Sequence, residues 1–142
     1  MDVEKLLIDT NVIIDLLAKR ERFYKDAQDL FTLADKKNIL LFVSSLTLAN
    51  THYVLSKYQN ANEARKTLIR FKVLVEVLPL GDKIIDLALV SNFNDFEDAI
   101  QYHSALENKL DMIITRNKKD FKNSEIPVFT VKEYLNRLLQ SN

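Results

Sequence analysis

Short runs of apolar residues alternate in this 142-residue chain with longer segments in which apolar residues recur at helical spacing. Short apolar runs bounded by polar residues are typical of strands that are buried on both faces of a sheet. Such runs occupy residues 6–8, 39–43, 75–78, 112–114 and 128–129. Because helical segments separate them, the strands are expected to be parallel and joined by crossover helices. The sequence therefore predicts an α/β domain.

The segments between the predicted strands carry the apolar stripes and end signals of helices. Helices are predicted over residues 11–19, 23–37, 45–58, 62–75, 82–90, 95–107 and 131–140. Asn62 is expected to cap the fourth helix, and Thr130 with Glu133 forms a capping box for the last. No linker, low-complexity stretch or internal repeat divides the chain, so residues 1–142 are expected to form a single domain.

The chain contains no cysteine, and Gly81 is its only glycine. The lack of cysteine excludes disulfides, cysteine-ligated zinc, iron–sulfur clusters and cysteine nucleophiles. Phosphate-binding loops of the types GxxxxGK[ST] and GxGxxG need several glycines, so P-loop and dinucleotide-binding chemistry are excluded as well. The GxSxG turn of serine hydrolases is missing for the same reason.

The sequence shows no sign of a membrane segment. Its longest apolar run, at 39–43, is far shorter than the ~20 residues that span a bilayer. The acidic start of the chain lacks the positive charge and the long apolar run of a signal peptide. A cytoplasmic protein is therefore expected.

The formal net charge is zero, because 20 basic residues balance 20 acidic ones. This balance argues weakly against a dedicated nucleic-acid-binding protein. However, residues 82–98 hold five acids and one base, whereas 19–25, 57–72 and 116–122 are basic. One interpretation is an acidic pocket flanked by basic surfaces that contact phosphates. The alternative is that these bases are ordinary solvated helix faces.

Polar residues follow each of the first four predicted strands. They are Asp9, Thr10 and Asn11; Ser44, Ser45 and Asn50; Asp95, Glu97 and Asp98; and Thr115, Asn117 and Asp120. In open parallel sheets the loops at the carboxyl ends of the strands gather along one edge. Carboxylate, amide and hydroxyl oxygens suit a hard cation such as Mg²⁺ or Mn²⁺. Such a cation can activate a water and neutralise a phosphate, as phosphodiester hydrolysis requires.

Several of these residues also have a purely structural interpretation. Asp9 and Asp95 could cap the helices that follow them. Glu97 could be a solvated acid of a first helical turn, and Asp98 a favourable acid in that turn. Asp15, four residues after Asn11, could reach the edge of the sheet, but most such helix acids are exposed. The two histidines of the chain lie on apolar helix stripes, so they are interpreted as core residues with satisfied nitrogens rather than as ligands.

Four segments together resemble the PIN domain family, and within it the group of VapC-like toxins. They are LIDTNVIID at 7–15, VSSLTLAN at 43–50, DFEDA at 95–99, and IITRN at 113–117 followed by Asp120-Phe121. They come in the family's order and span nearly the whole chain. The resemblance implies a three-layer α/β/α sandwich around a central parallel sheet of about five strands. It also implies divalent-metal-dependent cleavage of RNA.

The resemblance further implies roles for individual residues. Asp9 and Asp98 would be ligands of Mg²⁺ or Mn²⁺, with Asp120 a further candidate. The residues expected to support the ligands and the metal-bound water are Thr10, Asn11, Ser45, Glu97 and Thr115. Toxins of this group pair with a small antitoxin protein, and dimers are frequent in the family. An antitoxin and a second copy of the chain are therefore expected partners, beside the RNA substrate.

Two residues depart from the family's pattern. Asn50 and Asn117 align with positions that are usually acidic. An amide oxygen can bind or position a water, but it brings no charge. The aligned quartet therefore carries a charge of −2 rather than −4, which predicts weaker Mg²⁺ binding. Glu97 and Asp120 are candidate substitutes for the missing acids.

Three hypotheses about function follow. The first is a metal-dependent ribonuclease, the toxin of a toxin–antitoxin pair, whose catalytic residues are Asp9, Asp98, Asn50 and Asn117. The second is a catalytically degenerate PIN domain that serves as an RNA- or protein-binding module. The third is a receiver or phosphohydrolase-like domain in which Asp9 is phosphorylated. It is disfavoured because Asn11 stands where a phosphohydrolase has Asp.

Overall fold

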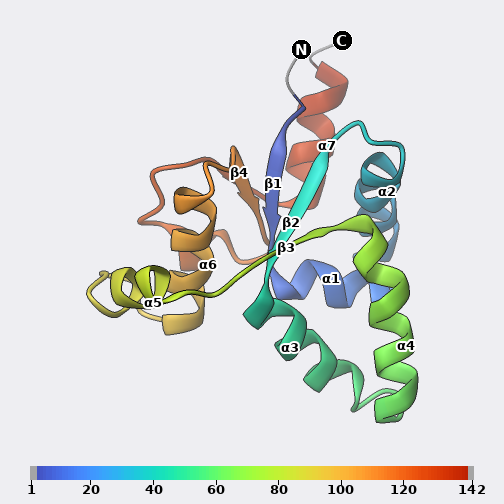
Figure 1. The fold of residues 1–142 in the computed structure, drawn as a ribbon. Helices are drawn as coiled ribbons and strands as arrows, with labels where there is room; N and C mark the ends of the chain where they lie inside the picture. The colour runs from blue at the N-terminus through green and yellow to red at the C-terminus, as the bar shows by residue number, and fades with distance from the viewer. Residues whose placement is uncertain (1–2, 141–142) are drawn as a thin grey trace.

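The computed structural model describes residues 3–140 and shows a five-stranded, all-parallel sheet with helices on both faces (Figure 1). The strands are β1 (Lys5–Ile8), β2 (Leu40–Ser44), β3 (Glu76–Leu78), β4 (Met112–Ile114) and β5 (Val128–Phe129). The helices are α1 (Thr10–Leu17), α2 (Tyr24–Asp35), α3 (Ser45–Leu55), α4 (Ala61–Phe71), α5 (Asp82–Leu89), α6 (Phe96–Glu107) and α7 (Val131–Gln140), with short turns η1 (Lys72–Leu74) and η2 (Lys118–Phe121). The predicted α/β/α fold is confirmed. The expected single domain includes residues 1, 2, 141 and 142, which lie outside the described residues, and it stays a prediction.

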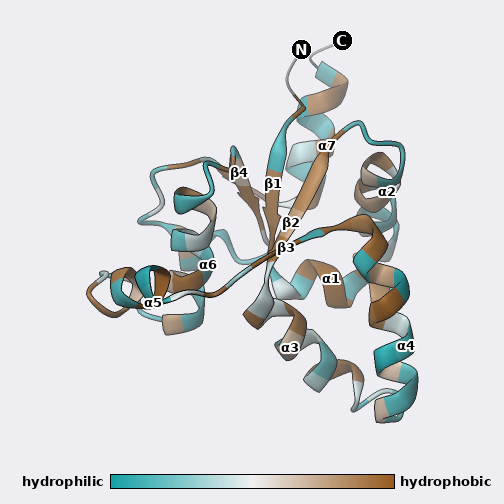
Figure 2. Ribbon diagram, viewed as in Figure 1, coloured by the Kyte–Doolittle hydropathy of each residue, from teal (hydrophilic) through white to brown (hydrophobic). Residues whose placement is uncertain are grey.

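The strand order β3-β2-β1-β4-β5 places β1 at the centre of the sheet. Leu7 of β1 is in register with Phe42 of β2 and with Ile113 of β4. Leu6, Leu7 and Ile8 are all fully buried. Because successive side chains of a strand point to opposite faces, this burial requires a helical layer on each face. Figure 2 shows the apolar strands at the centre of the molecule.

Separate apolar clusters on the two faces of the sheet form the core. Leu6 and Ile8 pack against residues of α1, α2, α4 and α7. Leu7 packs on the other face, against Tyr102 and Ala105 of α6. A smaller cluster joins α5 to α6. The three layers visible in Figure 1 follow from this division of the apolar residues.

The helix ends agree with the predicted signals in α7 but not in α4. The hydroxyl of Thr130 accepts the backbone N–H of Glu133, whose carboxylate accepts the N–H of Thr130, so the predicted capping box is confirmed. The prediction that Asn62 caps α4 is wrong. Asn60 caps the helix, because its side chain accepts the N–H of Glu63 at 2.9 Å while the backbone at Asn62 is already helical. Within residues 3–140 no helix is long and apolar enough to cross a membrane.

The carboxyl ends of β1 and β4 lie side by side at the centre of the sheet. The chain leaves β1 toward β2 on one side, whereas β4 is added on the other side, so the order of strands switches between β1 and β4. Ligands of open α/β sheets bind outside the strand ends at such a switch point. The backbone N–H of Asp9 donates to the carbonyl of Ile114 at 3.0 Å, which fixes the residue after β1 against the end of β4.

Candidate metal centre

Asp9 caps α1 and is almost entirely buried, with 8% of its surface exposed. Its Oδ1 accepts hydrogen bonds from the backbone N–H of Thr10 at 2.7 Å and from Nε2 of Gln101 at 3.0 Å. Its Oδ2 accepts the hydroxyl of Thr115 at 2.7 Å and Nδ2 of Asn11 at 3.3 Å. These donors lie at the start of α1, on α6 and after β4, so they hold the carboxylate in one orientation.

Asp98 lies in the first turn of α6, where Asp95 caps the helix by accepting the backbone N–H of Asp98 at 3.0 Å. Its half-buried carboxylate accepts no hydrogen bond from the residues that the structure describes. The pKa of Asp98 is raised to about 7, mainly by burial and to a smaller extent by nearby negative charges. The charges belong to Asp95, Asp9, Asp120 and Glu97. A cation placed against Asp98 would relieve both the desolvation and the repulsion.

A hollow of about 490 Å³ brings most of the predicted residues together. The predicted residues that line it are Asp9, Thr10, Asn11, Asn50, Glu97, Asp98, Asn117 and Asp120. With Asp95, its lining contains five carboxylates but only one guanidinium, that of Arg20. The hollow is therefore strongly acidic, and we call it the metal hollow.

Three predicted residues do not line the metal hollow. Ser44 is buried at the end of β2, where its side chain caps α3. Thr115 is fully buried, and it supports the site through its hydrogen bond to Asp9. Ser45 is the first residue of α3 and is half-buried, whereas the lining residues of this helix are Asn50, Tyr53 and Val54.

The two asparagines at the expected acidic positions are held differently. Nδ2 of Asn50 donates to Oε2 of Glu97 at 3.0 Å, which ties α3 to α6 beside the hollow. Glu97 is exposed, as its alternative interpretation predicts. The side chain of Asn117 is exposed, but its backbone N–H donates to the hydroxyl of Thr115 at 3.0 Å. Position 117 is therefore fixed relative to Asp9 through a single threonine.

Gln101 is a site residue that the sequence reasoning misses. It is 5% exposed, it lines the metal hollow, and its Nε2 donates to Asp9. Its Oε1 has no hydrogen-bond partner among the described residues. Its position could have been predicted from the sequence spacing. Gln101 follows Asp98 by three residues, and residues three apart lie on the same face of a helix.

Asp15 differs from the prediction that it is an exposed helix acid. It is 2% exposed, and its Oδ2 accepts Nε of Arg116 at 2.8 Å. Arg20 lies on its other side, with 3.6 Å between Nη1 and Oδ1. Burial raises the pKa of Asp15, and the two guanidinium groups oppose that rise. The prediction fails because the main partner is 101 residues away in the sequence.

The histidines are half-buried and do not line the metal hollow, as their interpretation as non-ligands implies. The expectation that their nitrogens are satisfied is wrong. Nε2 of His52 and Nδ1 of His103 are buried without a hydrogen-bond partner among residues 3–140. Burial lowers the pKa of His103, because desolvation disfavours the charged imidazolium.

The residues of the metal hollow fit a hard divalent cation. Within residues 3–140 no three histidine, aspartate or glutamate side chains lie close enough to form a preformed metal cluster. Mg²⁺, however, keeps much of its water and is usually held by one or two carboxylates together with phosphate oxygens of a substrate. Asp9 and Asp98 are the least exposed carboxylates of the hollow. This donor set suits Mg²⁺ or Mn²⁺ bound through two acids and water.

The fold and the hollow define a class of protein: a parallel α/β domain with an acidic site at the switch point of its sheet. Residues 5–119 match the sequence profile described as "PIN domain". The chain belongs to the PIN domain family. It is also similar to "Ribonuclease VapC1" of Aquifex aeolicus (strain VF5), with 30% identity over 145 residues that cover 96% of this chain and 97% of the relative.

Solved structures share the fold. A toxin–antitoxin complex from Klebsiella pneumoniae contains a chain that is 25% identical, with a TM-score of 0.66 over 89% of this chain and 97% of that one. A DNA-bound VapBC structure from Salmonella typhimurium contains a chain that is 18% identical, with a TM-score of 0.69 over 91% of this chain and 99% of the other. At that identity the Salmonella structure supports the fold alone.

Proposed function

We propose that this chain is a divalent-metal-dependent endoribonuclease. The observation that carries the proposal is the metal hollow, in which a fixed carboxylate, Asp9, lies near a half-buried one, Asp98, whose charge is unbalanced. The similarity to Ribonuclease VapC1 over nearly the full length of both chains supports RNA as the substrate. A carboxylate-lined hollow without cysteine or lining histidine suits hydrolysis of a phosphodiester.

In this proposal Asp9 and Asp98 hold Mg²⁺ or Mn²⁺, and Asp120 on η2 is the third candidate ligand. The bound cation would supply a water of lowered pKa and would neutralise charge on the scissile phosphate. Thr115 and Gln101 hold Asp9 in one orientation. Because the two oxygens of Asp9 already accept four hydrogen bonds, a donor such as Asn11, at 3.3 Å, would give way to the cation. Preorganised ligands of this kind are what phosphoryl chemistry requires.

The remaining polar residues orient the substrate and the ligands. Asn50 is expected to position a water or a phosphate oxygen, and its hydrogen bond keeps Glu97 turned toward α3. Asn117 is expected to do the same beside the end of β4. Thr10 and Asn11 hold Asp9 through N–H groups. Because the two amides bring no charge, we expect metal affinity near the weak, millimolar end of hard-cation sites.

The proposal is tested by incubating the purified protein with structured RNA in Mg²⁺, in Mn²⁺ and in EDTA. We expect cleavage with either cation and none in EDTA, with activity restored when excess Mn²⁺ is added back. Isothermal titration with Mn²⁺ in the absence of RNA should show binding. Equal cleavage with and without EDTA would contradict the proposal.

A second candidate is a binding module whose catalytic site has degenerated. Asn50, Asn117 and the lack of a three-acid cluster within residues 3–140 favour it. Titration separates the two functions, because a binding module should bind RNA or a partner protein without binding Mn²⁺. Binding of RNA or a partner protein, without cleavage and without metal binding, would support this second function instead.

We further propose that the chain is the toxin of a toxin–antitoxin pair. The solved complex from Klebsiella pneumoniae, whose matching chain is 25% identical, supports a small antitoxin partner. Co-purification with the product of a small reading frame beside the gene would test this. The homodimer stays a prediction, and light scattering of the purified protein would measure it.

Replacing Gln101 by Met keeps the size of the side chain but removes one of the four donors to Asp9. We expect cleavage to fall by roughly tenfold, because residues that orient a metal ligand typically contribute 10–100-fold. The free energy of unfolding should fall by about 1 kcal/mol, since losing the unpartnered Oε1 offsets part of the lost hydrogen bond.

Steady-state cleavage and urea unfolding measure the two effects. Gln140→Met, at the exposed end of α7, is the matched control and should change neither. If Gln101→Met behaves like that control, Gln101 does not position Asp9.

A further inference from the structure

A second hollow, of about 350 Å³, adjoins the metal hollow. Its lining includes Arg22, Phe23, Arg116, Asn117, Thr130 and Lys132. Asn117 also lines the metal hollow, so the two are neighbours at the end of β4. The second hollow brings together the segment before α2, the residues after β4 and the start of α7, which are far apart in the sequence. We call it the basic hollow.

Arg116 is held rigidly in the basic hollow by three contacts. Its Nε donates to the buried carboxylate of Asp15 at 2.8 Å. Its guanidinium carbon lies 4.2 Å from the centre of the Phe23 ring. Its backbone N–H donates to Oδ1 of Asn11 at 3.3 Å. Only Nε takes part in a side-chain hydrogen bond to a described residue, so both Nη groups remain available to a ligand. A fixed guanidinium whose Nη1–Nη2 edge is free is suited to bidentate binding of a phosphate.

The charge of the basic hollow is opposite to that of the metal hollow. Arg22, Arg116 and Lys132 contribute three cations. The lining also holds two acids, Asp15 and Asp26, so its net charge is +1, and Arg20 adds a further positive charge on the other side of Asp15. Arg22 and Lys132 form no ion pair with another described residue. The surplus positive charge favours an anion at this position.

The other lining groups favour a nucleotide over an inorganic anion. Phe23 supplies an aromatic ring, and the guanidinium groups of Arg116 and Arg22 lie 4.2 and 5.4 Å from its centre. Planar guanidinium groups and aromatic rings are surfaces on which bases stack. Thr130, Asn117 and Asp26 add hydroxyl, amide and carboxylate groups that can bind base edges. The volume lies within the range of small-molecule sites.

We propose that the basic hollow binds the RNA nucleotide adjacent to the phosphodiester that is cleaved. Its phosphate would lie against Arg116, Arg22 and Lys132, and its base would contact Phe23 or the guanidinium groups on it. The inference rests on the proposed ribonuclease function. It explains how a strand of phosphates can approach the acidic metal hollow, because the neighbouring phosphate is bound by fixed positive charge.

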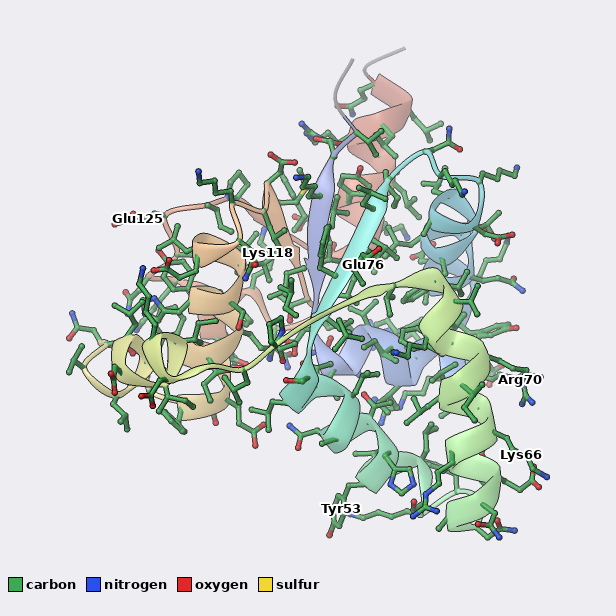
Figure 3. The ribbon with its side chains drawn as sticks, viewed as in Figure 1. Tyr53, Lys66, Arg70, Glu76, Lys118 and Glu125 are labelled. Carbon is green, nitrogen blue, oxygen red and sulfur yellow. The ribbon has the colours of Figure 1, made fainter. Side chains whose placement is uncertain are left out.

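The test uses the pair Arg22→Gln/Lys132→Gln, which removes two exposed charges that form no ion pair. The control with the same change of charge is Arg65→Gln/Lys66→Gln on α4. Lys66 points outward from the helix (Figure 3), and it forms an exposed ion pair with Glu63, with 3.6 Å between Nζ and Oε1. Binding of a fluorescein-labelled, single-stranded RNA 8-mer is measured in EDTA, and cleavage is measured in Mn²⁺. We expect the double variant Arg22→Gln/Lys132→Gln to bind RNA roughly five- to tenfold more weakly at 0.1 M salt. The slope of log K against log salt concentration should become smaller by about 1. KM should rise while kcat stays unchanged.

A second measurement follows the Nε–H resonance of Arg116 in ¹⁵N-labelled protein. Titration with the 8-mer should shift it, and Phe23→Leu should weaken that shift while Phe23→Tyr preserves it. The proposed subsite is wrong if the double variant Arg22→Gln/Lys132→Gln binds RNA as tightly as the control variant does. It is also wrong if a free nucleoside monophosphate binds as tightly as the 8-mer. If RNA binds in EDTA through these residues but wild type never cleaves it, the subsite stands and the proposed ribonuclease function fails.

Discussion

Replacing Asp98 by Asn is expected to reduce RNA cleavage by roughly 10²-fold or more, while it stabilises the metal-free protein. Cleavage should fall because the proposed metal would lose one of its two least exposed carboxylates. Stability should rise because Asp98 is a half-buried acid whose pKa is raised to about 7 by burial and by four neighbouring carboxylates. The amide keeps the shape of the side chain and removes the charge.

The pH dependence of stability follows from that shift. In EDTA the folded protein keeps the Asp98 proton up to about pH 7, whereas the unfolded chain loses it near 3.8. The contribution of Asp98 to the free energy of unfolding therefore falls as pH rises from about 4 to about 7, and it is constant above. Discounted for solvent screening, the loss is roughly 1–2 kcal/mol at pH 8, and Asp98→Asn should lack it.

Urea unfolding of wild type and variant across pH 4–8 in EDTA measures this difference. Asp86→Asn, which removes an exposed acid of α5, is the control and should change stability by less than about 0.5 kcal/mol. Added Mn²⁺ should stabilise wild type by about 1.4 kcal/mol at ten times its Kd, and the variant much less. A variant that is less stable than wild type at pH 8 would contradict the assigned environment of Asp98.

Replacing Asp9 by Asn should have the opposite effect on stability and the same effect on cleavage. All four partners of Asp9 donate hydrogen bonds to it. The hydroxyl of Thr115 already accepts from Asn117 and from Asn11, so it is a poor acceptor for a new amide. An Asn side chain must therefore point its NH₂ group at buried donors. We expect a loss of about 2–4 kcal/mol, or roughly 6–12 °C in Tm.

Thermal unfolding in EDTA and the cleavage assay measure the two consequences. Asp98→Asn serves as the matched comparison, because it makes the same chemical change on α6, at another carboxylate of the metal hollow. Both variants should be inactive, but only Asp9→Asn should unfold at a lower temperature. Equal stabilities of the two variants would show that the hydrogen bonds of Asp9 do not support the fold.

The sequence predicts most of the fold, because the signals for it are local. The apolar runs around Leu7 and Ile113 are typical of strands that are buried on both faces, and the structure confirms them. Asp9 follows the first strand and Asp98 comes after the third, and both line one hollow. The error at Asn62 is also local, since Asn60 carries the same capping chemistry two residues earlier.

Features that depend on tertiary partners could not be predicted. Asp15 resembles an exposed helix acid until Arg116 is placed beside it. Gln101 is unremarkable in a helix until its amide is seen against Asp9. The basic segment 57–72 contributes no side chain to the metal hollow, and the basic residue that lines this hollow is Arg20. Charge runs reveal composition, but only packing determines which side of the molecule they occupy.

The central position of β1 has a consequence for the protein during its synthesis. β1 is made first, but β4, which pairs with it in the finished sheet, follows about a hundred residues later. Thr115 and Gln101, which orient Asp9, are equally late in the chain. At translation rates of roughly 5–20 residues per second, the nascent chain spends many seconds without an assembled site. A chain that ends before residue 112 contains Asp9 but lacks β4 and Thr115, and we expect it not to cleave RNA.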